Sequence, residues 1–161
     1  MIASEDLTHS RALWHHAGEF RKASTTIQKA DKHGPHDRIG YYLICHSIEL
    51  CLKAFLRGKG FSIQGQRNLG HDLQKLVEEA DGHKLDDYFA ISSGQRTALL
   101  RANKYYVLKE LEYPVIGPKN LPDIELLNSL ADGLLDKTRD FCREKETLHD
   151  GTPTAERNWR H

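Results

Sequence analysis

The feature that most constrains this chain is the stretch 36–58, whose apolar residues cover most of the circumference of a helix. A helix that is apolar around most of its girth is normally buried among other elements. The stretch ends in Arg57-Gly58-Lys59-Gly60, which places cations in a last turn and glycine where the chain reverses. We therefore expect the central helix of a bundle, with one face formed by Tyr41, Ile44, Cys45, Ile48, Leu52 and Phe55.

Apolar residues recur at helical spacing along the rest of the chain, and strand-like alternation is nearly absent. Proline and glycine divide this pattern into segments, because neither residue continues a helix easily. In chain order we expect a helix from near Ser4 to just before His33, the helix 36–58, a loop at about 60–70, a short helix around 73–80, a helix at about 93–110, and a helix from Pro122 to just before Gly151.

The length and composition fit one domain with a real core. The chain has 161 residues, of which 39% are hydrophobic and 29% charged, so it is too apolar for a disordered chain. The predicted fold is an all-α, up-and-down helical bundle of four long helices and one short helix over residues 1–150. A polar and flexible tail is expected at 151–161.

Charge and cysteine content exclude several classes of protein. The 23 Lys and Arg residues balance the 23 Asp and Glu residues, so a strongly basic coat for nucleic acid is not expected. No apolar run reaches the roughly 18–20 residues of a membrane span, and the acidic N-terminus is unlike a signal peptide. The three cysteines, Cys45, Cys51 and Cys142, form no CxxC pair and indicate reduced thiols in a cytoplasmic protein.

A narrow polar stripe runs along the otherwise apolar helix 36–58. Tyr42, His46, Glu49 and Lys53 are spaced by four, three and four residues, which places them on one helical face. In one interpretation the stripe faces solvent and Glu49–Lys53 is an ordinary surface ion pair. In the other, the stripe faces a groove or a second subunit, where His, Glu and Lys side chains would form a polar site.

At these residues the chain resembles the HEPN domain family. The segment 41–56 contains a polar residue, then Glu49, then Leu52-Lys53-Ala54, and Gly70-His71-Asp72-Leu73 follows after a glycine-containing loop. Tyr105-Tyr106 and the later Glu112-Tyr113-Pro114 resemble another segment of the family, although Glu112 stands where the family usually has arginine. The resemblance covers about residues 10–148.

The resemblance implies a small helical bundle, often a homodimer. It implies a binding module for a nucleotide, for RNA, or for a partner protein of the nucleotidyltransferase type, which in toxin–antitoxin systems serves as antitoxin. The candidate binding residues are the stripe and the pair His71 and Asp72. A plainer alternative for Asp72 is that its carboxylate only stabilises the start of the next helix.

The family also contains metal-independent endoribonuclease toxins of toxin–antitoxin and defence systems, and this activity is the alternative function. Their motif is Arg, four to six residues, then His, and Arg143 and His149 match it with five residues between them. The histidine would act as general acid and base, and the arginine would stabilise charge on the phosphate. Against this, the two side chains lie about 120° apart on a helix, and Glu144 would repel a phosphate, so a plain surface role stays open.

No cofactor or metal is expected. A di-iron bundle needs two Glu-x-x-His motifs, and only Glu146-Thr147-Leu148-His149 matches.

Overall fold

The helix expected at 36–58 is present as α2 (Asp37–Gly58) in the computed structural model, which describes residues 9–30 and 37–149. The described residues contain no strand, so the all-α prediction is confirmed. The expectations for Ser4, as the start of the first helix, and for the tail at 151–161 lie outside the described residues. The other helices are α1 (Ser10–Ala30), α3 (Ile63–Leu69), α4 (Leu73–Gly82), α5 (Ser93–Tyr106), α6 (Ile124–Lys137) and α7 (Arg139–His149), with a 3-10 turn at Leu85–Asp87 between α4 and α5.

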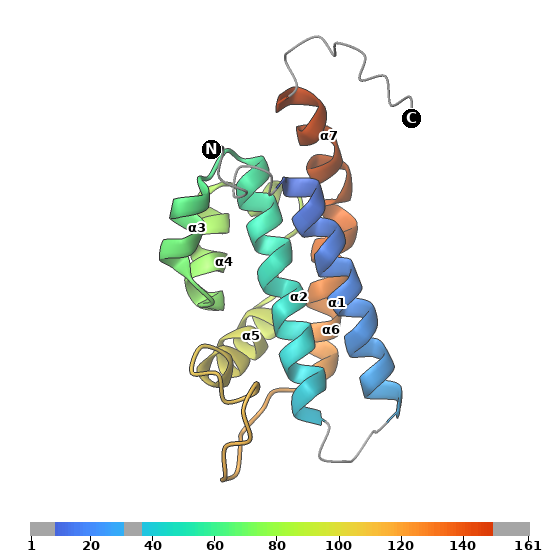
Figure 1. Ribbon diagram of the computed structural model, residues 1–161, viewed down its shortest axis with the longest axis vertical. Coiled ribbons are helices and arrows are strands. Elements are labelled where there is room, and N and C mark those ends of the chain that lie inside the picture. The colour runs from blue at the N-terminus through green and yellow to red at the C-terminus, as the bar shows by residue number, and fades with distance from the viewer. Residues whose placement is uncertain (1–8, 31–36, 150–161) are drawn as a thin grey trace, which may run out of the picture.

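Helix α2 occupies the centre of the bundle, as its apolar girth predicted. It packs against α1, α4, α5, α6 and α7, and its long contact with α1 is visible in Figure 1. By length and composition alone, Arg38–Gly58 could cross a membrane, but 67% of its most apolar window is buried inside the protein. A core helix of a bundle passes the same test, because both environments demand apolar side chains.

A short helix, α3, replaces the loop expected at about 60–70. Ser62 caps it, with its hydroxyl accepting a hydrogen bond from the Gly65 amide at 3.0 Å. The Gln66 side chain then donates to the backbone carbonyl of Lys53 at 2.6 Å, which fastens α3 to α2. A capped turn and one tertiary bond therefore form a helix that apolar periodicity did not indicate.

The helix expected from Pro122 to about 150 is two helices. Helix α6 begins after Asp123, whose side chain accepts from the Glu125 amide, and it ends at Lys137. Thr138 separates α6 from α7, and its hydroxyl donates to the Leu134 carbonyl at 2.7 Å. Threonine in this position competes with the helix backbone for its carbonyls, which agrees with an interruption here.

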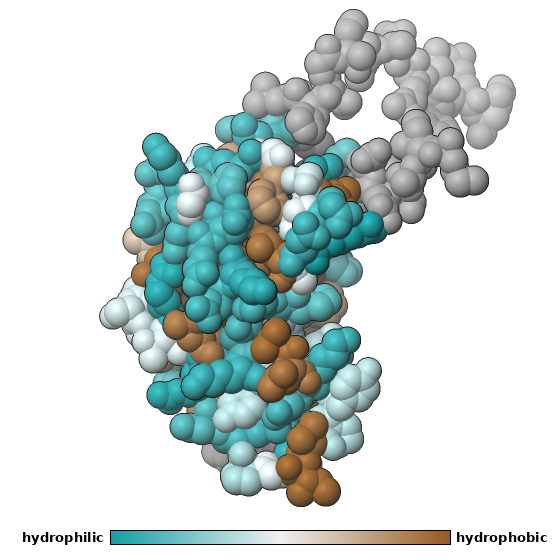
Figure 2. Space-filling model, turned by 90° about the vertical axis from the view of Figure 1, so that its left-hand side faces the viewer, coloured by the Kyte–Doolittle hydropathy of each residue, from teal (hydrophilic) through white to brown (hydrophobic). Residues whose placement is uncertain are grey.

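Helix α5 ends at Tyr106 rather than near residue 110, and the chain leaves it as a projecting segment. Lys109, just beyond the end of α5, has a positive φ of 60°, which a helix does not allow. We call residues 107–122 the arm, and it projects from the lower end of the bundle in Figure 1. In Figure 2 the face that carries it is largely hydrophilic, with apolar atoms gathered at its lowest point.

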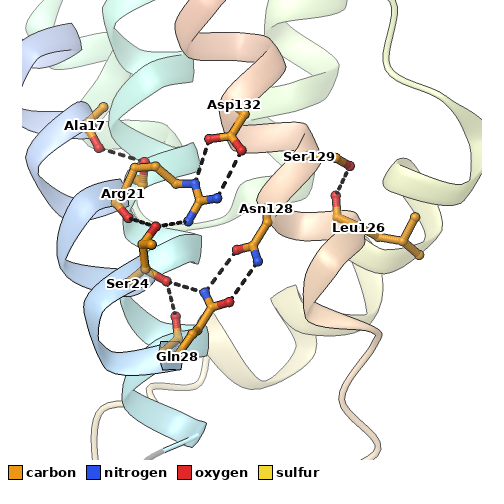
Figure 3. A network of polar contacts seen from close by, with 11 residues as sticks. Ala17, Arg21, Ser24, Gln28, Leu126, Asn128, Ser129 and Asp132 are labelled. Carbon is orange, nitrogen blue, oxygen red and sulfur yellow. Dashed lines mark hydrogen bonds and ion pairs between the residues drawn. The ribbon is translucent and has the colours of Figure 1, made fainter. Parts of the chain in front are cut away.

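A row of polar contacts, which we call the seam, joins α1 to α6. Arg21 donates two hydrogen bonds to the Asp132 carboxylate, at 2.7 and 3.0 Å. The Gln28 and Asn128 amides donate to each other at 3.0 and 2.8 Å, as Figure 3 shows. Because such paired amides fit in one register only, the seam fixes how α1 lies along α6.

Candidate functional site

Glu49 lies at the centre of the candidate site and is buried, with 1% of its surface exposed. Its Oε1 accepts hydrogen bonds from Lys53 Nζ at 2.7 Å and from His71 Nδ1 at 2.9 Å. Its Oε2 accepts from the Tyr106 hydroxyl at 2.5 Å. The stripe on α2 therefore faces the interior of a polar cluster, and the interpretation of it as a solvated surface is wrong at Glu49.

Three separate segments supply these donors. Lys53 is one helical turn after Glu49 on α2, and Tyr106 is the last residue of α5. His71 lies in the turn between α3 and α4, where Gly70 has a positive φ of 61° that glycine adopts without strain. The sequence places the three donors far apart, and the packing of α4 and α5 on α2 brings them to one carboxylate.

The charge of Glu49 is stabilised in the folded protein. Burial by itself raises the pKa of a carboxyl group, but hydrogen bonding from His46, the charge and hydrogen bond of Lys53 and the hydrogen bond of Tyr106 outweigh burial here and hold the pKa of Glu49 at about 2. Burial, and then the Glu49 charge, raise the pKa of Tyr106, so that its hydroxyl stays protonated and donates. The cluster is thus a buried anion surrounded by donors.

Proton positions follow from the acceptors. A carboxylate has no proton to give, so His71 must carry its proton on Nδ1 to bond Glu49. Tyr106 spends its only proton on Glu49, so its oxygen accepts from His46 Nδ1 at 2.9 Å. Glu49 therefore sets the tautomer of both histidines, directly for His71 and through Tyr106 for His46. In the neutral form of each ring, Nε2 is then the nitrogen without a proton.

The surface above this cluster is a small pocket. The Tyr42 ring is stacked on His46 with centroids 5.9 Å apart, and its hydroxyl donates to Glu112 at 3.3 Å. The side chain of His71 is 60% exposed. The pocket has a volume of about 50 Å³, which suits one or two water molecules and is too small for a nucleotide. It is lined by Tyr42, His46, His71, Tyr106, Lys109 and Glu112.

The contacts of Asp72 are local and structural. Its Oδ1 accepts from the Gln74 and Lys75 amides at 3.1 and 3.3 Å, so Asp72 caps α4. The same oxygen accepts from Asn103 on α5 at 2.9 Å, and Asn103 in turn accepts from the Leu73 amide. These bonds hold the turn that carries His71 against α5, so Asp72 positions His71 rather than facing the pocket.

The candidate nuclease pair lies on another part of the molecule. Arg143 is exposed on α7, and the side chain of His149 lies outside the described residues. In Figure 1, α7 is at the opposite end of the bundle from α5, which supplies Tyr106 to the site. The structure therefore does not join Arg143 to the Glu49 cluster.

Tyr106, Lys109 and Glu112 were not among the predicted site residues. Tyr106 follows the apolar face of its helix and reads as a core residue, but a buried tyrosine hydroxyl needs a partner, and that was the available signal. Lys109 and Glu112 lie in the arm, where helical periodicity gives no information about direction. Their place beside His71 depends on how α5 ends.

Within the described part of the chain, no group of three or more His, Cys, Asp and Glu side chains could hold a metal ion. Comparison with protein-family models, with curated proteins and with solved structures finds no match for this chain.

Proposed function

We propose that this protein is a HEPN-like binding module and that it binds RNA or a nucleotide across the surface above Glu49. The observation that carries the proposal is the burial of a carboxylate under exposed His71. Ionised groups are rarely buried without a task, because desolvation opposes them. Here the carboxylate fixes the orientation of the side chains that reach the surface, which is how binding sites are preorganised.

The chemistry of this surface suits a phosphate-bearing ligand that lies across it. His71 and Lys109 offer donors, and Tyr42 offers a partly exposed ring on which a base can stack. Because the pocket of about 50 Å³ admits no whole nucleotide, contact with the ligand is superficial. A nucleotidyltransferase-type partner protein is the other ligand that the resemblance implies.

The test is fluorescence polarisation with a labelled single-stranded RNA, competed by unlabelled nucleotides at low salt. We expect His71→Ala and Lys109→Ala to weaken binding roughly tenfold, which corresponds to about 1.4 kcal/mol. Lys22→Ala, an exposed lysine on α1, is the matched control and should change affinity less than about twofold. Equal losses in all three variants, or no binding of RNA or nucleotide by wild type, would overturn the proposal.

A second function, metal-independent endoribonuclease activity, is favoured by the exposure of Arg143, which leaves its guanidinium free to meet a phosphate. Purified protein would be incubated with a mixed RNA pool in EDTA, with Arg143→Ala and His149→Ala in parallel. Cleavage by wild type and by neither variant supports this function. Cleavage that persists in both variants comes from another source.

A further inference from the structure

A cavity of about 650 Å³ lies where α1 meets α2 and the start of α6. Sites for small molecules measure about 300–1,000 Å³, so a ligand of that size fits here. The cavity shares no lining residue with the pocket above Glu49, and a ligand of that pocket does not account for it. The polar groups that line the cavity have bonding capacity to spare, and this capacity indicates the kind of ligand.

The Gln28–Asn128 amide pair of the seam, shown in Figure 3, is a deeply buried part of the lining. Gln28 donates both of its amide protons, one to Asn128 at 3.0 Å and one to the Ser24 hydroxyl at 2.7 Å. Asn128 is 6% exposed and donates one amide proton to Gln28 at 2.8 Å, while its second proton meets no acceptor among the described residues. Each side-chain oxygen accepts one bond within the pair and has a second lone pair left. The amide pair therefore offers one N–H donor and two oxygen acceptors, which match the C=O and N–H of a peptide group.

Opposite charges line the two sides of the cavity. On the α1 side, Lys29 is exposed and forms no ion pair with the described part of the chain. Arg21 lies on the same side, but its charge is balanced by Asp132, which accepts two hydrogen bonds from it at 2.7 and 3.0 Å. On the α6 side, Asp123 and Glu125 are exposed, and neither carboxylate pairs with a cation of the described residues. One side thus offers a free ammonium group and the other offers two free carboxylates.

This lining disfavours two common classes of ligand. A helix start commonly attracts anions, but the carboxylates of Asp123 and Glu125 at the start of α6 would repel a phosphate. A purely apolar ligand would leave the spare N–H of Asn128 without a partner, which costs free energy. A molecule with a positive end, a central peptide group and a negative end meets all three groups. The lengths agree, since packed helices have axes about 8–10 Å apart and an extended dipeptide spans about 7 Å.

We propose that this cavity binds a peptide of two or three residues with both termini free. Its ammonium group pairs with Asp123 and Glu125, and its carboxylate pairs with Lys29. Its peptide group bonds to the Gln28–Asn128 amide pair. The apolar part of the lining, which includes Tyr41 and Ile124, accommodates an aliphatic side chain of the peptide. A segment inside a longer chain lacks both terminal charges, so the site selects short peptides.

This site is separate from the proposed binding of RNA or a nucleotide, and its test uses no nucleic acid. The ¹⁵N-labelled full chain would be titrated with the dipeptide leucyl-alanine and followed by NMR. We expect the side-chain amide signals of Gln28 and Asn128 to shift, with a dissociation constant at or below about 1 mM. Acetylating the amino end of the peptide, or amidating its carboxyl end, removes one charge and should weaken binding to wild type at least fivefold.

Variants of the protein assign each end of the peptide. Lys29→Ala should weaken the binding of leucyl-alanine at least fivefold but leave the binding of the amidated peptide unchanged, because that peptide has no carboxylate. Asp123→Asn/Glu125→Gln should likewise weaken leucyl-alanine but not the acetylated peptide, and asparagine still caps α6. Lys22→Ala, an exposed lysine of α1 outside the lining, is the control and should bind leucyl-alanine within about twofold of wild type.

Three results would each overturn the proposal. The first is that leucyl-alanine at about 10 mM leaves the Gln28 and Asn128 side-chain signals in place. The second is that the acetylated and amidated peptides bind wild type as tightly as leucyl-alanine does. The third is that Lys22→Ala weakens binding as much as Lys29→Ala. Circular dichroism confirms folding of every variant, and all the substituted side chains are exposed, so misfolding is unexpected.

Discussion

Replacing Glu49 by glutamine tests whether the buried carboxylate organises the site. The substitution keeps the shape of the side chain but removes its charge and turns one acceptor oxygen into a donor. Lys53, His71 and Tyr106 all donate to this carboxylate, so at least one of them would then face another donor. Breaking a buried charge pair in this way costs about 3–5 kcal/mol.

The pH dependence of unfolding gives a second estimate of how much the Glu49 charge stabilises the fold. The pKa of Glu49 is about 2 in the folded protein against an ordinary value of 4.5, and this difference corresponds to about 3 kcal/mol of stability at neutral pH. Because the folded pKa is the lower one, this stability is present above pH 4.5 and is lost as the pH falls toward 2. Glutamine does not titrate, so the difference in free energy of unfolding between wild type and Glu49→Gln should become smaller over that pH interval.

The assay is urea unfolding followed by circular dichroism at several pH values between 7 and 2.5. Subtracting the free energy of unfolding of the variant from that of wild type at each pH removes the contribution of the other carboxylates, which the two proteins share. Glu112→Gln is the control, since Glu112 is exposed, accepts a hydrogen bond from Tyr42 at 3.3 Å and pairs with Lys109 at 3.9 Å, so losing its charge should cost less than about 1 kcal/mol. A loss below about 1 kcal/mol for Glu49→Gln at pH 7, or a difference independent of pH, would refute this account of the cluster.

Further substitutions test the elements that hold the site. Asp72→Ala should lower the free energy of unfolding by about 1–2 kcal/mol, because α4 loses its cap, while Asp72→Asn should cost less; both are measured by urea unfolding. Gly58→Ala should destabilise by about 1–3 kcal/mol, since an added Cβ would lie 2.6 Å from the packed Phe141 ring. Gly18→Ala on α1 meets nothing within 4 Å and should instead stabilise by about 0.5–1 kcal/mol, so thermal melts of the two variants should shift in opposite directions.

The sequence predicted helices where apolar periodicity is long. Helix α2 begins and ends within a residue of expectation, because its apolar girth and its Arg-Gly end are both strong local signals. Helix α3 was missed because seven residues are too few for periodicity, and its stability comes from the Ser62 cap and from the bond of Gln66 to α2. The break at Thr138 was missed because the apolar pattern continues across it from Leu134 to Phe141.

The site was predictable along one helix and not between helices. Spacing on α2 placed Tyr42, His46, Glu49 and Lys53 on one face, and the structure has them there. Spacing says nothing about what that face meets, so the direct bond from Tyr106 to Glu49 and the burial of Glu49 came only with the packing of α5. The resemblance to the HEPN family supplied His71, which local physics alone would have left as a turn residue.

The shared contacts of α2 also determine how the chain can be divided. Helix α2 packs against helices on both sides of the arm in sequence, α1, α4 and α5 before it and α6 and α7 after it. A cut within the arm would therefore leave a first fragment whose α2 still shows the apolar surface that α6 and α7 normally cover. Neither fragment has a closed core, so the two should fold only on meeting, as a complementing pair. In the intact chain, the amides of α2 should exchange with solvent hydrogen only when the whole protein opens.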